Sequence, residues 1–125
     1  MNNEKNSSDL VKIKRRTTGP VPLLRALFLT LIMKKPKITG YDILHMTPET
    51  INTSIEMKTG TVYTELRRLE KSGFVKSIQS QEGRKSRHYE ITTEGVEELK
   101  ALNTQIKNRI KFLIEPLIEL MDSVL

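Results

Sequence analysis

Residues 59–73 read TGTVYTELRRLEKSG and hold the most regular helical pattern in the chain. Three apolar residues recur at intervals of four and three, which places them on one buried stripe of an α-helix: Val62, Leu66 and Leu69. Thr59 is the predicted N-cap, and Gly73 stands where helices commonly end in a left-handed residue. At about 100° per residue the opposite face carries small residues and cations: Gly60, Thr64, Arg67, Arg68 and Lys71.

An apolar segment precedes this cationic helix. Residues 23–33 are apolar on nearly every side apart from Arg25, which predicts a buried helix. Pro22 suits the first turn of that helix, and the run Lys34-Lys35-Pro36 ends it.

A second helix is expected to begin after Thr39, which is its predicted N-cap, with Asp42 at the capping-box position. Tyr41 is expected in the core, where it would pack this helix on the preceding one. Thr47 and Pro48 have the form of a new N-cap followed by proline at the first helical position. We therefore expect a kink or a restart at this point.

Two strands are predicted after the cationic helix, at residues 74–81 and 87–92, and a glycine-containing hairpin connection joins them. Tyr89 and Ile91 share one face of the second strand because side chains alternate along a strand. The connection and its flank are basic, with the cationic or titratable residues Arg84, Lys85, Arg87 and His88.

Residues 93–125 follow one long helical pattern, which Pro116 is expected to kink or split. Its apolar residues form a seam at intervals of three and four: Leu99, Leu102, Ile106, Ile110, Leu113, Leu117, Leu120 and Val124. A helix of about 30 residues extends for about 45 Å, farther than one small body can cover. The seam therefore predicts a partner helix.

Composition and charge limit the function classes. The chain has 125 residues and no cysteine, which indicates one domain and excludes disulfides, thiolate zinc sites and iron–sulfur clusters. No apolar run is long enough for a membrane span, and the N-terminus does not resemble a secretory signal, so a soluble cytoplasmic protein is expected. The net charge of +6 is concentrated in residues 1–91, which carry 17 Lys or Arg against 9 Asp or Glu. This imbalance favours a polyanionic partner.

The order of elements is typical of a winged helix-turn-helix: mostly α, with a small β-hairpin and a long C-terminal helix. We expect a flexible basic arm at residues 1–19, a winged-helix domain at 20–95 and a dimerisation segment at 96–125. In such a domain the third helix enters the DNA major groove and the wing contacts the backbone or the minor groove. No metal or cofactor is expected.

The expected DNA contacts fall in three groups. The helix supplies Thr59, Gly60, Thr61, Tyr63, Thr64, Arg67 and Arg68. The wing supplies Arg84, Lys85, Arg87 and His88. The arm supplies Lys12, Lys14, Arg15 and Arg16. For Tyr63 two roles stay open, because its ring can pack on the core and its hydroxyl can reach a phosphate.

Three motifs carry a family resemblance: GYDI at residues 40–43, GTVY at 60–63 and LRRLEKSGFV at 66–75. Together with RHYEITTEG at residues 87–95 they resemble the PadR family of transcriptional regulators over roughly residues 22–100. The resemblance implies a homodimeric winged-helix regulator, usually a repressor, that dimerises through its C-terminal helices and binds a pseudo-palindromic operator. The family often has proline where this chain has Thr59 and Thr64.

Other function classes are less well supported. Two separated histidines and no phosphate-cradling glycine loop leave no catalytic set, so no enzyme is expected. The alternative function is a winged-helix module for protein contact, which the salt dependence of DNA binding would distinguish. The operator sequence, the regulated genes and the existence of an effector do not follow from the sequence. If a small-molecule effector exists, we expect it near the dimer axis, beside Leu24, Leu27, Phe28, Leu31, Phe112 and Met121.

Overall fold

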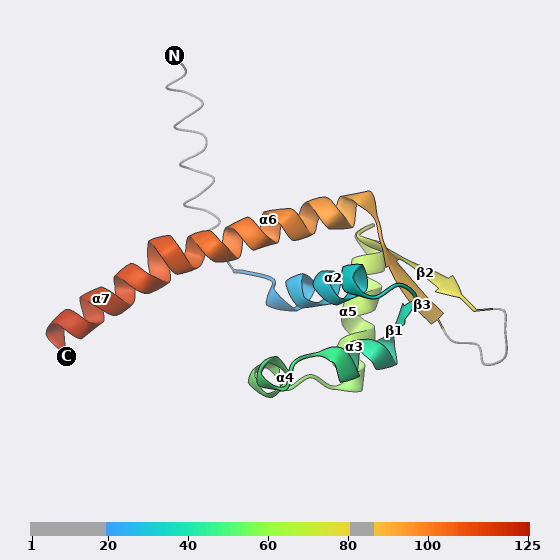
Figure 1. Cartoon of the computed structure of the whole chain (residues 1–125), viewed down its shortest axis with the longest axis horizontal. Helices are drawn as coiled ribbons and strands as arrows, with labels where there is room; N and C mark the ends of the chain where they lie inside the picture. Colours follow the sequence, from blue (N-terminus) through green and yellow to red (C-terminus); the bar gives the residue numbers. More distant parts are fainter. Residues whose placement is uncertain (1–19, 81–86) are drawn as a thin grey trace, which may run out of the picture. The chain divides into compact units, whose positions relative to one another are not determined.

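The computed structural model describes residues 20–80 and 87–125 (Figure 1). Its elements in chain order are α2 (Leu23–Lys34), β1 (Ile38–Thr39), α3 (Gly40–Met46), α4 (Glu49–Ile55), α5 (Thr59–Lys71), β2 (Val75–Gln79), β3 (Arg87–Ile91), α6 (Thr93–Arg109), the π-helical turn η1 (Ile110–Ile114) and α7 (Glu115–Val124). The described chain divides into two compact units. Residues 23–99 form the first unit, and residues 20–22 and 100–125 belong to the second. The predicted arm and the predicted hairpin turn lie outside the described residues.

The core of the first unit lies among α2, α3, α5 and the sheet. Each of these elements contributes large side chains that are completely buried: Phe28, Leu29, Ile38, Ile43, Val62, Leu66 and Leu69. The predicted stripe on α5 is therefore confirmed, and so is the predicted buried helix, which ends at Lys34 before Pro36. Four helices, α2 to α5, precede the strands β2 and β3, because the second predicted helix is divided into α3 and α4, and the architecture is mostly α as predicted (Figure 1).

The sheet has three antiparallel strands in the order β1-β3-β2. Both predicted strands are present, and their register pairs Val75 with Ile91 and Gln79 with Arg87. The third strand, β1, was not predicted, because two residues are too few to show an alternating pattern. Tyr89 of the central strand is 6% exposed and pairs with Ile38 of β1.

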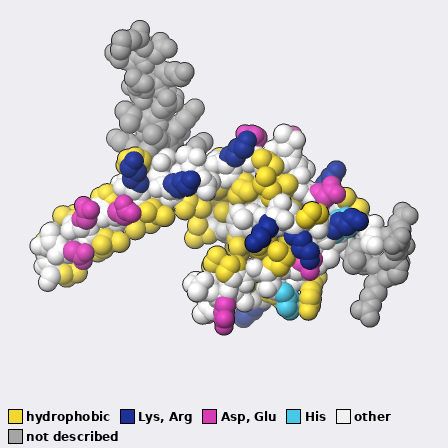
Figure 2. Space-filling model, in the orientation of Figure 1, with side chains coloured by type: hydrophobic (Ala, Val, Ile, Leu, Met, Phe, Trp, Pro, Cys, Tyr) yellow, Lys and Arg dark blue, Asp and Glu magenta, His cyan; other side chains and the backbone are white. Residues whose placement is uncertain are grey.

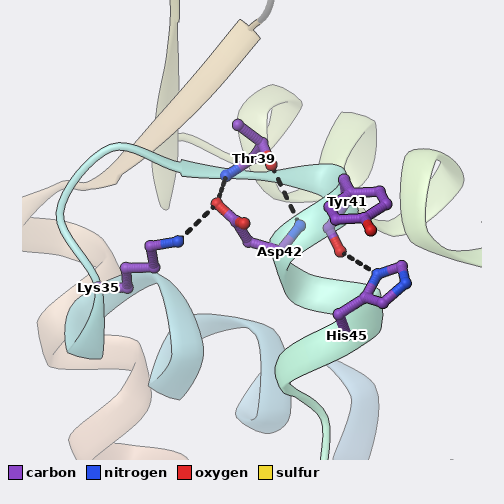
Figure 3. Close-up of polar contacts among 5 residues, drawn as sticks. All are labelled: Lys35, Thr39, Tyr41, Asp42 and His45. Carbon is purple, nitrogen blue, oxygen red and sulfur yellow. Dashed lines mark hydrogen bonds and ion pairs between the residues drawn. The ribbon is translucent and has the colours of Figure 1, made fainter.

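The start of α3 is fixed by the predicted capping box (Figure 3). The backbone N–H of Asp42 donates to Thr39 Oγ1 at 3.1 Å, and the backbone N–H of Thr39 donates to Asp42 Oδ2 at 3.0 Å. The ammonium group of Lys35 also lies 3.0 Å from this carboxylate. The Thr39 N–H and then the Lys35 ammonium lower the pKa of Asp42, against an opposing effect of burial.

Two expectations for α3 and its end are wrong. Tyr41 is 67% exposed rather than in the core, because the buried face of α3 is formed by Gly40 and Ile43. Its ring stacks instead on His45, with 3.9 Å between the ring centroids (Figure 3). The helix does restart at the predicted place, but Thr47 is not the new N-cap. Its hydroxyl donates back to the carbonyl of Ile43 at 2.7 Å, and Pro48 takes the N-cap position of α4.

The two ends of α5 differ from each other. At its start Lys58 is the N-cap, so the prediction for Thr59 is off by one residue, and no side chain caps the helix. At its end the N–H of Phe74 donates to the Leu69 carbonyl at 3.0 Å, and that of Gly73 donates to Glu70 at 3.1 Å. Gly73 has φ +81°, so the chain leaves α5 through the predicted left-handed glycine in a Schellman motif.

A tight joint connects the sheet to α6. The backbone N–H of Thr92 donates to the Phe74 carbonyl at 3.0 Å, and its hydroxyl donates to the Gly73 carbonyl at 2.6 Å. The Gly95 N–H donates to the same hydroxyl at 3.0 Å. A Cβ atom on Gly95 would lie 2.1 Å from the Phe74 carbonyl oxygen, so only glycine permits this approach.

In the second unit, η1 interrupts the helix directly before Pro116, which confirms the expected break. The N–H of Glu115 donates to the Ile110 carbonyl, five residues back, as in a π-helix. Pro116 has no N–H, and it stands within the first two positions of α7, where no intrahelical donor is required.

Gly95→Ala should destabilise the fold by about 3 kcal/mol or more, since the added methyl group meets backbone that cannot move aside. Gly60→Ala is the matched control, because nothing lies within 4 Å of a Cβ atom at this position of α5. That change should leave stability unchanged or raise it by about 0.5–1 kcal/mol. Urea unfolding measures both. Equal stability of the two variants would contradict the tight joint.

The capping box predicts a pH-dependent stability. The pKa of Asp42 is lower in the folded chain than its ordinary value of 3.8, so the ionised carboxylate stabilises the fold above that value. The stabilisation is lost as the pH falls through the lowered pKa. Asp42→Asn should therefore reduce the free energy of unfolding by about 1 kcal/mol at pH 7 and by less at pH 3, which lies below the ordinary pKa of 3.8. A loss that is the same at both pH values would argue against this role.

Candidate nucleic-acid interface

The outward face of α5 is set by its buried stripe. Val62, Leu66 and Leu69 are at most 1% exposed, so rotation of the helix about its axis is fixed. Thr59, Gly60, Arg67, Arg68 and Lys71 are consequently exposed, while Thr61 and Thr64 are half-buried. The N-terminus of α5 lacks a side-chain cap, which leaves backbone N–H groups and the positive end of the helix dipole available to an anion.

The two arginines on α5 have different electrostatic surroundings. Arg68 Nη1 lies 3.6 Å from Glu65 Oε2, and the residue Glu65 is only 7% exposed. Arg67 forms no ion pair within the part of the chain that the structure describes. Burial of Glu65 was not predicted. Its position beside Leu69, at the edge of the buried stripe, is a usable sequence signal. The charge of Arg67 is the one more available to a partner.

A cavity of about 490 Å³ lies where α3, α5, β1 and β3 meet. Its lining includes residues predicted to contact DNA from the helix and from the wing. It is lined by Thr39, Gly40, Tyr41, Tyr63, Arg67, Arg87 and Tyr89. Arg67 comes from α5 and Arg87 from the first position of β3, twenty residues later in the sequence. Burial raises the pKa of Tyr89, which keeps its hydroxyl protonated at neutral pH.

Tyr63 lies over the N-terminus of α3. A Cβ atom on Gly40 would be 3.0 Å from Cε1 of the Tyr63 ring and 3.3 Å from its hydroxyl oxygen. The ring therefore packs on the Gly40 backbone while the side chain stays 45% exposed. Both roles left open for Tyr63 are compatible with this position. The contact with Gly40 was not foreseeable from the sequence, because the two residues are 23 positions apart.

The remaining residues that were predicted to contact DNA are not part of the cavity lining. His88 is half-buried, and strand alternation places it on the opposite face of β3 from Arg87 and Tyr89. Arg84 and Lys85 of the wing, and Lys12, Lys14, Arg15 and Arg16 of the arm, lie outside the described residues. Phe28 and Leu31 are 0% and 5% exposed and therefore belong to the core.

Within residues 20–80 and 87–125, no three His, Cys, Asp or Glu side chains are grouped so that they could bind a metal. Asp42 is engaged by Thr39 and Lys35, and His45 Nδ1 lies 2.9 Å from the Tyr41 carbonyl oxygen (Figure 3). Among the helices in the described ranges, none combines the length and the apolar character of a membrane span.

The model of the family described as "Transcriptional regulator PadR-like family" matches residues 28–101. Among solved structures, Bacillus subtilis PadR in complex with operator DNA is similar with 28% identity and a TM-score of 0.57, over 66% of this chain and 47% of that chain. A PadR family regulator from Clostridium difficile is similar with 25% identity and a TM-score of 0.61, over 74% of this chain and 96% of that one.

A PadR-like regulator from Bacillus cereus, 22% identical with a TM-score of 0.59, shares the fold over 77% of this chain and 91% of its own. The present chain therefore spans about half the length of the B. subtilis protein but nearly all of the C. difficile one. No curated protein sequence matches it. These similarities confirm the winged-helix fold and the resemblance drawn from the three sequence motifs. Since the family model covers more than half of the sequence, the chain belongs to the PadR-like family of transcriptional regulators, which are not enzymes.

Proposed function

We propose that this protein binds a specific double-stranded DNA operator as a homodimer and represses transcription there. The observation that carries the proposal is the face of α5, on which an uncapped N-terminus and exposed cations stand opposite a completely buried stripe. A helix held in this way can enter the major groove without losing its packing on the core. The complex of B. subtilis PadR with operator DNA supports DNA as the partner.

The side chains on α5 suit two different tasks. Thr61 and Thr64 are short and lie on the first two turns, where residues of a recognition helix reach base edges. Arg67 on α5 and Arg87 at the start of β3 carry charge and suit phosphate contacts, which supply affinity more than sequence preference. Thr61 and Thr64 would therefore set the sequence, and the arginines would hold the duplex.

The C-terminal helix supports the homodimer. On α7 the apolar residues of the seam are exposed in the single chain, with Leu117 at 46%, Leu120 at 64% and Val124 at 79%. Figure 2 shows apolar side chains running along this helix, with acidic side chains beside them. A strip of this kind at heptad spacing is stabilised when a second copy covers it. A symmetric dimer would present two recognition helices to a pseudo-palindromic site.

Repression follows from the position of a bound dimer rather than from further chemistry. A dimer on a pseudo-palindrome contacts half-sites about 34 Å apart, or a multiple of that distance. A site that overlaps a promoter would then be closed to RNA polymerase. A reporter gene behind a selected site should be less active when the protein is present, and an increase would indicate activation instead.

Substitutions should separate sequence reading from phosphate contacts. Thr61→Ala and Thr64→Ala should change the sequences selected from a random duplex pool, with losses on the preferred duplex of about 1–3 kcal/mol. Arg87→Ala should weaken binding to the preferred and to a scrambled duplex alike, and should lower the salt slope by about one. Fluorescence anisotropy over a KCl series measures both effects. Protein that binds no duplex above background would instead favour the module for protein contact.

Two variants test the homodimer: one adds a negative charge within the seam, and the control adds a negative charge outside it. Leu117→Asp should give monomers, because it places a carboxylate in the apolar face between two helices. Ser123→Asp is the control, since this exposed residue of α7 lies outside the seam and should leave the dimer intact. Sedimentation velocity measures the mass of each variant. Dimers that persist in Leu117→Asp would show that the seam is not the interface.

A further inference from the structure

The cavity at the junction of α3, α5 and the sheet has a lining that suits an anion. Its two charged lining residues, Arg67 and Arg87, are both cations, and no carboxylate is part of its lining. The nearby carboxylates are engaged elsewhere. Asp42 binds Thr39 and Lys35, and Glu70 Oε1 accepts from the Ser77 hydroxyl at 2.6 Å. The cavity therefore keeps a positive charge that no neighbouring carboxylate in the described chain neutralises through an ion pair.

The same lining supplies neutral donors. Tyr41, Tyr63 and Tyr89 carry phenol groups. Arg87, Glu70, Tyr63 and Arg67 all act on the charge of Tyr89, so these groups lie within electrostatic reach of it, and Glu70 is the one carboxylate among them. Guanidinium groups and phenols together match the non-bridging oxygens of a phosphodiester, which accept several hydrogen bonds. Guanine also presents acceptors that an arginine can bind, but such a contact would not depend on the charge of one phosphate.

Gly40 determines where the Tyr63 phenol lies. The ring carbon Cε1, the ring carbon Cζ and the hydroxyl oxygen of Tyr63 would lie 3.0, 3.2 and 3.3 Å from a Cβ atom on Gly40. Two ring carbons and the hydroxyl oxygen of Tyr63 thus rest on a backbone that has no side chain. Any larger residue at position 40 would move the hydroxyl, because Tyr63 is half-exposed and has room to turn away.

We infer that this cavity is a subsite for one backbone phosphate of the bound DNA, held by Arg67, Arg87 and the Tyr63 hydroxyl, with Gly40 as the positioning residue for Tyr63. The inference rests on the proposed function and makes it more specific, since it assigns one phosphate to one place between the recognition helix and the wing. A duplex cannot enter the cavity, but a phosphate that protrudes from its backbone can.

The first test is a double-mutant cycle on the full-length protein. The probe is a duplex that the wild-type protein selects from a random pool. Tyr63→Phe should weaken binding about tenfold, the loss expected for one hydrogen bond to a charged group. Gly40→Ala should weaken it by a similar factor, and the double variant should be no weaker than either single one. Losses that multiply would show that Gly40 does not act through Tyr63 and would overturn the positioning role.

Lys76→Ala is the control for charge, because this exposed lysine on β2 is paired with Glu90 at 3.5 Å and is not part of the lining. It should bind the duplex much more tightly than Arg67→Ala or Arg87→Ala. Thermal unfolding shows whether each variant is folded. If Gly40→Ala does not fold, the phosphate contact is decided by the second test, which does not use that variant.

The second test removes the phosphates one at a time. In a set of duplexes, each carrying one neutral methylphosphonate, one position in each half-site should cost the wild-type protein about tenfold in affinity. At that position Tyr63→Phe and Arg87→Ala should lose much less, while Lys76→Ala should lose as much as the wild type. If the wild type binds the duplex but no position behaves in this way, the subsite is refuted and DNA binding stands. If the wild type prefers no duplex, the proposed function fails as well.

A third test distinguishes binding of a DNA phosphate from binding of a free anion. Inorganic phosphate should displace the duplex no better than chloride at the same ionic strength, because one free phosphate lacks the neighbouring contacts of a duplex. Stronger displacement by phosphate in the wild type, absent in Tyr63→Phe, would show that the cavity is a free-anion site and would overturn the inference.

Discussion

The fixed rotation of α5 is the constraint on which the site depends. Three apolar side chains at intervals of four and three are completely buried, and rotation of α5 by even one residue's angle would expose at least one of them. Burying a side chain of this size stabilises a fold by about 1.5–3 kcal/mol, so the three together exceed what any single surface contact supplies. The positions of Arg67 and of Tyr63 follow from this stripe. The DNA-facing side of the helix is thus determined from within the core.

Local signals explain what was predictable from the sequence. The capping box of Thr39 and Asp42, the left-handed Gly73 and the interruption at Pro116 each depend on residues within one or two helical turns. Chemistry of this range is visible in a single sequence. The strand β1 was missed because its two residues pair with β3, about fifty positions away.

The candidate site was predictable residue by residue but not as a cavity. Arg67 and Arg87 were identified as DNA contacts from their charge and from the elements that carry them, yet only the fold, which brings residues of α5 and β3 to one cavity, places them in the same lining. The contact of Tyr63 with Gly40 depends on the fold in the same way. Tyr41 shows the reverse case, because an aromatic residue was assigned to the core on type alone although Ile43 is the buried residue of that turn.

The short helix α4 has no buried residue, while Thr47 just before it and Met57 just after it are both 7% exposed. The segment between them is therefore attached to the core at its two ends and is otherwise only partly packed, with Asn52 and Ile55 half-buried. In evolutionary terms its sequence can change widely, provided that its length still spans the two attachment points. This freedom explains why Pro48, which departs from the pattern of a continuous second helix, is accommodated here without displacing α5.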